Sequence, residues 1–203
     1  MDEWGLRTIF WGGAGLDGNY IDDFINKLQS SGINNVHRGL HASDGMIIDA
    51  LKVNQLRLKN YAGLYFDFDP NNSCSLNEQN NYIGYSYGSL LAAQTAYYKA
   101  SIRHCYIDNL VLIGSPIDSD FLDTLKNNQY IGKVIVINLN NFGDPIYAGM
   151  SESSLMMSVP ILMYQQFSSG KDGKGHFYYA GSSMMAKRRR LMLSLYIQSL
   201  GLK

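Results

Sequence analysis

The sequence is poor in charged residues and in cysteine. Only 17% of its 203 residues are charged, and the formal net charge is +0. A nucleic-acid-binding surface needs clustered Lys and Arg, so this composition argues against nucleic acid as a partner. Cys74 and Cys105 are far apart and lack the spacing of metal ligands, and they fit one disulfide or two free thiols equally well.

The sequence also lacks a targeting segment and a long hydrophobic run. Its acidic start, residues 1–4, is followed by no apolar segment of the signal-peptide type, and no run is long enough to span a bilayer. We therefore expect a cytoplasmic protein. Export by machinery that reads no cleavable signal is the alternative. Without repeats or linkers, and with 46% hydrophobic residues, the chain is expected to form one domain over residues 1–203.

Short apolar segments of β type alternate with helical patterns along most of the chain. Strands are expected near residues 7–11, 33–37, 81–83, 109–113 and 133–138, and helices near residues 20–28, 46–56, 90–96, 119–127 and 182–200. This alternation predicts an α/β fold with a mostly parallel, doubly wound sheet and functional loops after the carboxyl ends of its strands. Residues 147–175 give no clear element: a Met-rich apolar patch is followed by a glycine-rich loop.

Ser86 lies where a predicted strand turns into an apolar helix, with Gly84 and Gly88 on either side. A serine at such a turn has a strained backbone, and glycines at this spacing remove bulk that would collide with the neighbouring strand and helix. The turn presents the hydroxyl at a helix N-terminus, where negative charge is favoured. A glycine-flanked surface turn is the alternative interpretation of the pattern alone.

The stretch Gly84–Ser89, Gly-Tyr-Ser-Tyr-Gly-Ser, resembles the nucleophile elbow of the α/β-hydrolase superfamily and is most similar to those of lipases, esterases and some thioesterases. The resemblance extends from Thr8 to the final predicted helix. It implies a single-domain α/β-hydrolase fold without a large cap domain. No strand is evident between Asp144 and His176, where the superfamily usually has its penultimate one.

The superfamily order of nucleophile, acid and histidine implies roles for three residues. Ser86 would be the nucleophile, His176 the general base, and Asp144 the acid that orients the histidine. Asp144 follows a buried strand, where the superfamily carries its acid, although an Asp before Pro is also a common turn former. Asp118, after the preceding strand, is the competing candidate. His176 is the histidine that follows the acid in the chain.

The resemblance also implies an oxyanion site made of main-chain N–H groups. The Tyr87 N–H would supply one donor, and the glycine loop after the first strand would supply the other, with Gly13 preferred over Gly12. This loop begins Trp11-Gly12 where related families often carry His-Gly. It has neither the Gly-Lys-Ser/Thr of a phosphate loop nor the spacing of a dinucleotide fingerprint.

The remaining polar residues suggest neither a cofactor nor a metal site. Asp67 and Asp69 have no further ligands at useful spacing. His37 and His41 could line a pocket, but surface positions are the simpler explanation. The run Lys187–Arg190 indicates a solvated face, with transient contact to a phosphate group or membrane surface as the alternative.

The resemblance implies a serine hydrolase that cleaves carboxylic esters through an acyl-enzyme. The Met-rich patch Met150–Met163, with Tyr85 and Tyr87 beside the nucleophile, favours a lipidic acyl group over a sugar or peptide, because Met and Tyr offer adaptable apolar contact area. These methionines could equally fill core. The alternatives are a thioesterase or acyltransferase with the same triad, or a non-catalytic binding module with this fold.

Overall fold

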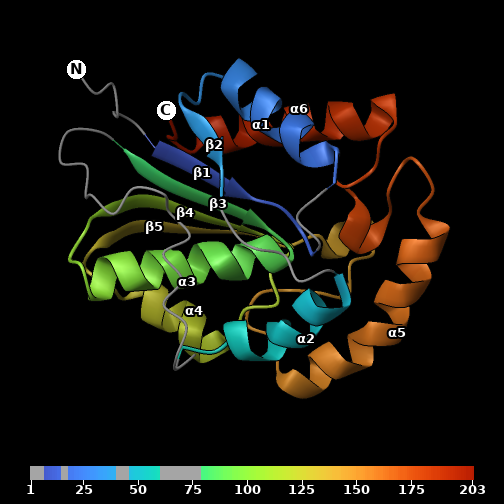
Figure 1. Ribbon diagram of the computed structural model, residues 1–203, viewed down its shortest axis with the longest axis horizontal. Helices are drawn as coiled ribbons and strands as arrows, with labels where there is room; N and C mark the ends of the chain where they lie inside the picture. Colours follow the sequence, from blue (N-terminus) through green and yellow to red (C-terminus); the bar gives the residue numbers. More distant parts are fainter. Residues whose placement is uncertain (1–6, 15–17, 40–45, 60–78) are drawn as a thin grey trace.

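The computed structural model describes residues 7–14, 18–39, 46–59 and 79–203 (Figure 1). The predictions that concern Cys74, His41, Asp67 and Asp69 fall outside these residues. The elements of the described ranges are β1 (Arg7–Trp11), α1 (Tyr20–Ser30), β2 (Val36–Arg38), α2 (Met46–Leu56), β3 (Asn80–Tyr85), α3 (Tyr87–Ser101), β4 (Ile107–Ile113), α4 (Ser119–Lys126), β5 (Ile131–Ile137), α5 (Glu152–Ser168) and α6 (Met184–Ser199), with short 3₁₀ turns η1 (Asn140–Phe142) and η2 (Gly175–Phe177).

The five strands form one sheet in the order β2-β1-β3-β4-β5, and every pairing is parallel. From β1 the chain passes first to β2 on one side and then to β3 on the other. The strand order therefore reverses between β1 and β3, which is where open parallel sheets place their ligands. Trp11, the last residue of β1, is in register with Gly84. The predicted glycine loop and elbow thus leave the sheet side by side.

Helices cover both faces of this sheet, as Figure 1 shows. Because neighbouring strand residues point to opposite faces, Ile9 and Leu110 pack with buried residues of α3 and α4, whereas Phe10 and Val111 pack with those of α1 and α6. Both faces of the central strands are buried, which explains their continuous apolar sequence. The predicted α/β class and parallel sheet are confirmed.

The largest difference from the expected elements is α5, a helix of 17 residues in the segment that gave no clear pattern. The Ser151 hydroxyl caps it by accepting from the Ser154 N–H. The helix contains Pro160, and its apolar residues lie on its exposed side as well as its buried side, so no single apolar stripe marks a buried face in the sequence. Residues 144–176, all described, contain this helix and no strand.

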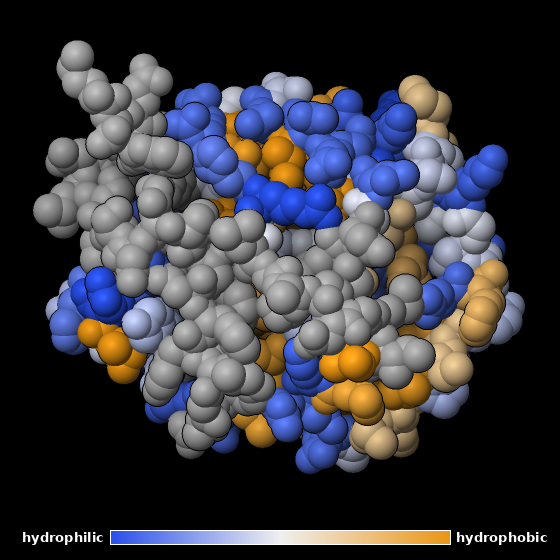
Figure 2. All heavy atoms as spheres, in the orientation of Figure 1, coloured by the Kyte–Doolittle hydropathy of each residue, from blue (hydrophilic) through white to orange (hydrophobic). Residues whose placement is uncertain are grey.

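The methionines of the apolar patch are divided between the interior and the surface. Met150 is buried with Ile146 and Leu155, while Met156 and Met157 of α5 are exposed. Figure 2 shows hydrophobic side chains at the surface where α2 and α5 lie. None of the described helices is long and apolar enough to cross a membrane.

The basic run of α6 is solvated only in part, which corrects the expected solvated face. Lys187 and Arg188 are exposed, but Arg190 is 1% exposed. Its guanidinium pairs with Asp23 of α1 at 2.7 Å and donates to the carbonyl oxygens of Tyr179 and Gly181. A buried guanidinium needs such partners because an unpaired buried charge is very costly. Arg190 therefore joins α6 to α1 and to the segment that follows His176.

Candidate active site

Ser86 lies at the tip of the turn between β3 and α3, at the carboxyl end of the sheet. Its backbone has φ 56° and ψ −125°, a conformation that residues with a Cβ rarely adopt. The Ser86 N–H donates to the Ile113 carbonyl at 2.8 Å, and the Ser86 carbonyl accepts from the Ser89 N–H at 2.9 Å. These bonds to β4 and to the first turn of α3 hold the strained residue in place. The predicted strain at this serine is confirmed.

The two flanking glycines are required by close backbone approaches. A Cβ on Gly84 would overlap the backbone of Gly88 and Ser89 in α3. A Cβ on Gly88 would overlap the carbonyl groups of Trp11 and Gly12 at the end of β1. Both contacts involve backbone atoms, which cannot move aside as a flexible side chain can. The steric reason that the sequence suggested for this glycine spacing is therefore correct.

His176 connects Ser86 to Asp144 through a continuous chain of hydrogen bonds. Its Nε2 lies 2.6 Å from Ser86 Oγ, and its Nδ1 lies 2.9 Å from Asp144 Oδ2. A carboxylate can only accept, so Nδ1 carries the proton and Nε2 is left to accept from the Ser86 hydroxyl. The residues come from three segments: the elbow, the loop after β5 and the η2 turn. The structure thus brings together the three residues that the sequence proposed.

The carboxylate of Asp144 is fully buried and is hydrogen-bonded at both oxygens. Oδ2 faces His176, and Oδ1 accepts from the Ile146 N–H at 2.8 Å. Gly114, at the end of β4, has φ +53°, and a Cβ there would lie 3.3 Å from Asp144 Oδ2 and 3.7 Å from His176 Cε1. A glycine at this position leaves room for the pair. Burial with both oxygens paired fixes the carboxylate in one orientation.

Asp118, the competing acid, has a structural role elsewhere. It is the N-cap of α4 and accepts from the Asp120 N–H at 2.9 Å. Its other oxygen lies 3.7 Å from the guanidinium of Arg57, which also donates to the Pro116 carbonyl. The carboxylate next to His176 is therefore that of Asp144.

The backbone of His176 is held at both its N–H and its carbonyl group. The side chain of Gln165 in α5 accepts from the His176 N–H at 2.9 Å and donates to the Gly143 carbonyl at 2.7 Å. The hydroxyl of Tyr85 donates to the His176 carbonyl. Burial raises the pKa of Tyr85 well above its usual value, with smaller contributions from Tyr20 and Asp144. The phenol consequently stays protonated and remains a donor.

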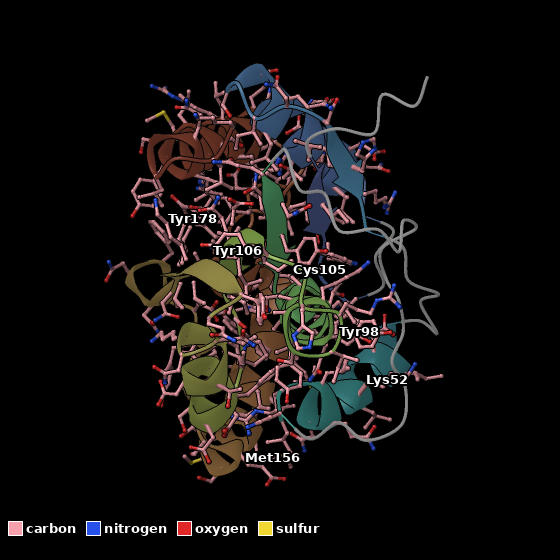
Figure 3. The ribbon with its side chains drawn as sticks, turned by 90° about the vertical axis from the view of Figure 1, so that its left-hand side faces the viewer. Lys52, Tyr98, Cys105, Tyr106, Met156 and Tyr178 are labelled. Atoms are coloured by element: carbon pink, nitrogen blue, oxygen red, sulfur yellow. The ribbon has the colours of Figure 1, made fainter. Side chains whose placement is uncertain are left out.

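A column of stacked side chains fixes the residues on either side of this turn. The ring of Phe142, two residues before Asp144, stacks on Tyr178 with centroids 3.9 Å apart. The guanidinium of Arg189 covers the same Tyr178 ring at 4.0 Å. Figure 3 shows Tyr178 beneath α6, the helix that carries Arg189. The acid loop, the histidine turn and α6 are thereby clamped together.

The sequence did not single out Gln165 or Tyr178, and it assigned different roles to Tyr85 and to Arg189, which it counted in a solvated basic run. Tyr85 and Tyr87 were expected to contact an acyl group, but each is 2% exposed and packs in the core. Gln165 and Tyr178 carry no local pattern, because their partners lie far away in the chain. The one available signal was that a histidine predicted in a loop needs partners to hold it in place, and this need could have directed a search for such residues.

Gly13 and Tyr87, the predicted oxyanion donors, both border Ser86. Tyr87 is the first residue of α3. A Cβ on Gly13 would lie 3.6 Å from Ser86 Cβ and 3.8 Å from its Oγ. The Gly13 N–H, however, donates to the hydroxyl of Tyr20 at 2.6 Å. A substrate oxygen can use this N–H only in exchange for Tyr20, a residue that the sequence did not suggest.

The other polar residues form no second centre in the described part of the chain. His37 and His104 are exposed, and neither is hydrogen-bonded to Ser86 or His176. No group of three or more His, Cys, Asp or Glu side chains among the described residues could hold a metal ion.

No protein-family model matches the sequence, and no curated protein matches it either. The functional interpretation consequently depends on the geometry. A hydroxyl that donates to a neutral imidazole, itself oriented by a buried carboxylate, can be deprotonated as it attacks an electrophile.

We expect Gln165→Ala to destabilise the protein, because the substitution leaves the His176 N–H and the Gly143 carbonyl without their partner. The free energy of unfolding, measured by urea titration, should fall by about 1–3 kcal/mol. Gln198→Ala, at an exposed position of α6, is the control and should change it by less than about 0.5 kcal/mol. Equal values for the two variants would contradict a bracing role for Gln165.

Proposed function

We propose that this protein is a serine hydrolase of the α/β-hydrolase type that cleaves carboxylic esters. The observation that carries the proposal is the chain from Ser86 Oγ to His176 Nε2 at 2.6 Å and from Nδ1 to Asp144 Oδ2 at 2.9 Å. The strained backbone of Ser86 supports it, because a plain surface turn has no need of a residue at φ 56°. Support also comes from the position of the serine, where the strand order reverses.

In the proposed reaction, Ser86 Oγ attacks the ester carbonyl carbon while His176 Nε2 takes the hydroxyl proton. The buried Asp144 stabilises the imidazolium that forms. His176 then returns this proton to the leaving alcohol as the tetrahedral intermediate collapses to an acyl-enzyme. A water molecule, deprotonated by the same imidazole, attacks the acyl-enzyme and releases the carboxylic acid and free Ser86.

The oxyanion of the tetrahedral intermediate is proposed to accept from the N–H groups of Tyr87 and Gly13. The first N–H groups of a helix have no partner within the helix, and their dipoles favour negative charge. Tyr87 is the first residue of α3, so its N–H is one of these first N–H groups. Gly13 can contribute once the carbonyl oxygen replaces the Tyr20 hydroxyl as its acceptor.

A lipidic acyl group is the substrate class that we favour within this proposal. Support for it comes from α5, which carries exposed apolar side chains and braces His176 through Gln165. An apolar surface beside the catalytic histidine suits esters presented by lipid more than small polar esters.

Substitution of Ser86 or of Asp144 should greatly lower hydrolysis of p-nitrophenyl butyrate while the fold is retained. Ser86→Ala should lower kcat by several orders of magnitude, and Asp144→Asn by roughly three to four, because the amide favours the wrong histidine tautomer. Asp118→Asn is the control: it keeps a side chain that can cap α4 but removes the charge that pairs with Arg57, so the melting temperature falls slightly and kcat changes by less than about tenfold. If Asp118→Asn were as inactive as Asp144→Asn, the acid would be wrongly assigned.

Tyr20→Phe tests whether Gly13 is an oxyanion donor. The variant removes the hydroxyl that occupies the Gly13 N–H, so a substrate oxygen no longer competes for it. Because one hydrogen bond contributes about 0.5–1.5 kcal/mol net, kcat/KM for p-nitrophenyl butyrate should rise by a few-fold, and an unchanged value would count against Gly13 as a donor. A drop of about a hundredfold at an unchanged melting temperature would mean that the Tyr20 hydroxyl itself stabilises the oxyanion.

A further inference from the structure

The outward face of α5 is apolar, which is the reverse of an ordinary surface helix. Its buried residues are Leu155, Ser158 and Gln165, and Glu152 in the first turn is its one charged residue. The exposed large apolar side chains follow two adjacent helical rows, Met156–Val159–Met163–Phe167 and Met157–Ile161–Tyr164. Among them, Met157, Tyr164 and Phe167 are 71%, 72% and 84% exposed.

The apolar surface continues from α5 onto α2. Ile48 and Leu51 of α2 are 47% and 72% exposed. The two helices are neighbours, because Asn54 of α2 donates to Glu152 at 3.5 Å and Val53 packs on the small core beneath α5. Figure 2 shows this surface as a hydrophobic area over α2 and α5, and Figure 3 shows Met156 at the outer end of α5. A continuous apolar area of this kind marks an interaction site.

Basic side chains gather at the carboxyl-terminal end of α5. Lys171 and Lys174 follow the helix and are exposed, as are Lys187 and Arg188 at the start of α6. The two groups are held at one end of the molecule, because the N–H groups of residues 182 and 183 both donate to the Lys171 carbonyl, at 2.8 and 2.9 Å. Within residues 168–188, these four positive charges are accompanied by one exposed acid, Asp172. The local charge is thus positive although the net charge of the whole chain is +0.

We propose that this surface, the outward face of α5 with Ile48, Leu51 and the adjoining basic residues, docks on an anionic lipid surface. Apolar side chains enter the acyl region, Tyr164 and Phe167 lie at the level of the headgroups, and the lysines contact phosphate. A second copy of this chain would match the apolar face but not the cluster of positive charge, because each copy offers the same basic end. The charge therefore favours lipid over self-association.

This docking proposal extends the proposed hydrolase function, and its biological purpose rests on that function being correct. The helix that contacts lipid also carries Gln165, whose side chain accepts from the His176 N–H. Because Gln165 is on the buried face of α5, a protein held by the outward face would have its histidine turn one helix away from the lipid, which gives ester substrate a short path from the surface to Ser86. Docking itself needs neither an intact Ser86 nor turnover.

Co-sedimentation with sucrose-loaded vesicles of phosphatidylcholine, with and without phosphatidylglycerol, tests the proposal. The wild type should bind the anionic vesicles, and added salt should weaken this binding. Met157→Glu with Phe167→Glu should lower the partition coefficient by at least about tenfold, because two charges enter the apolar face. Lys171→Gln with Lys174→Gln should weaken binding to the vesicles that contain phosphatidylglycerol and should not change binding to those of phosphatidylcholine. Ser86→Ala should bind like the wild type.

The matched control is Ile102→Glu with Tyr106→Glu. These residues are 54% and 50% exposed and lie at the amino end of β4, opposite to the site. This variant should bind vesicles like the wild type. Both double-glutamate variants should hydrolyse dissolved p-nitrophenyl butyrate at the wild-type rate, which separates docking from catalysis. If the wild-type protein did not hydrolyse this ester, the hydrolase proposal would be refuted. If the wild-type protein hydrolysed it but did not bind anionic vesicles, only the docking proposal would be refuted.

Three results would overturn the docking proposal. One is an absence of wild-type binding to anionic vesicles. Another is an equal loss of binding in the α5 variant and in the Ile102/Tyr106 control. The third is a stable dimer in light scattering that the α5 substitutions dissociate, because the surface would then be the interface between two copies.

Discussion

The site depends on the fixation of one loop residue, His176. Ser86 is held by a strand and a helix, and Asp144 follows a strand, but His176 lies in a short 3₁₀ turn and must still come within 2.6 Å of a serine 90 residues away. Its N–H donates to the Gln165 side chain and its carbonyl accepts from the Tyr85 hydroxyl, and these two bonds define the turn. Much of the surrounding structure, including the apolar helix α5, can be understood as support for this position.

The parts of the site that follow from local sterics could be predicted from the sequence. Gly84 and Gly88 are needed because backbone atoms approach them directly, and such a need leaves a fixed spacing around Ser86. The alternation of apolar strands and helices likewise predicted the α/β class and the parallel sheet. The order of Ser86, Asp144 and His176 followed from a family resemblance, and the structure places the three within hydrogen-bonding distance.

The parts that depend on distant contacts could not be predicted. α5 was missed because its apolar residues face outward and its sequence has no stripe that would mark a buried side. The sequence predicted only that Tyr20 begins a helix, yet its hydroxyl reaches back to the Gly13 N–H. Arg190 stands in a run of four basic residues, and only the folded chain shows that it alone is buried against Asp23.

The central claim is that Ser86 is an activated nucleophile, and reaction with a fluorophosphonate probe tests it most directly. Such a probe traps a serine whose proton is taken by a neighbouring base, and an ordinary surface serine does not react. Intact-mass measurement followed by peptide mapping should show one adduct per chain, on Ser86. A chain that stays unlabelled under conditions that label a known serine hydrolase completely, or an adduct on a different residue, would contradict the account.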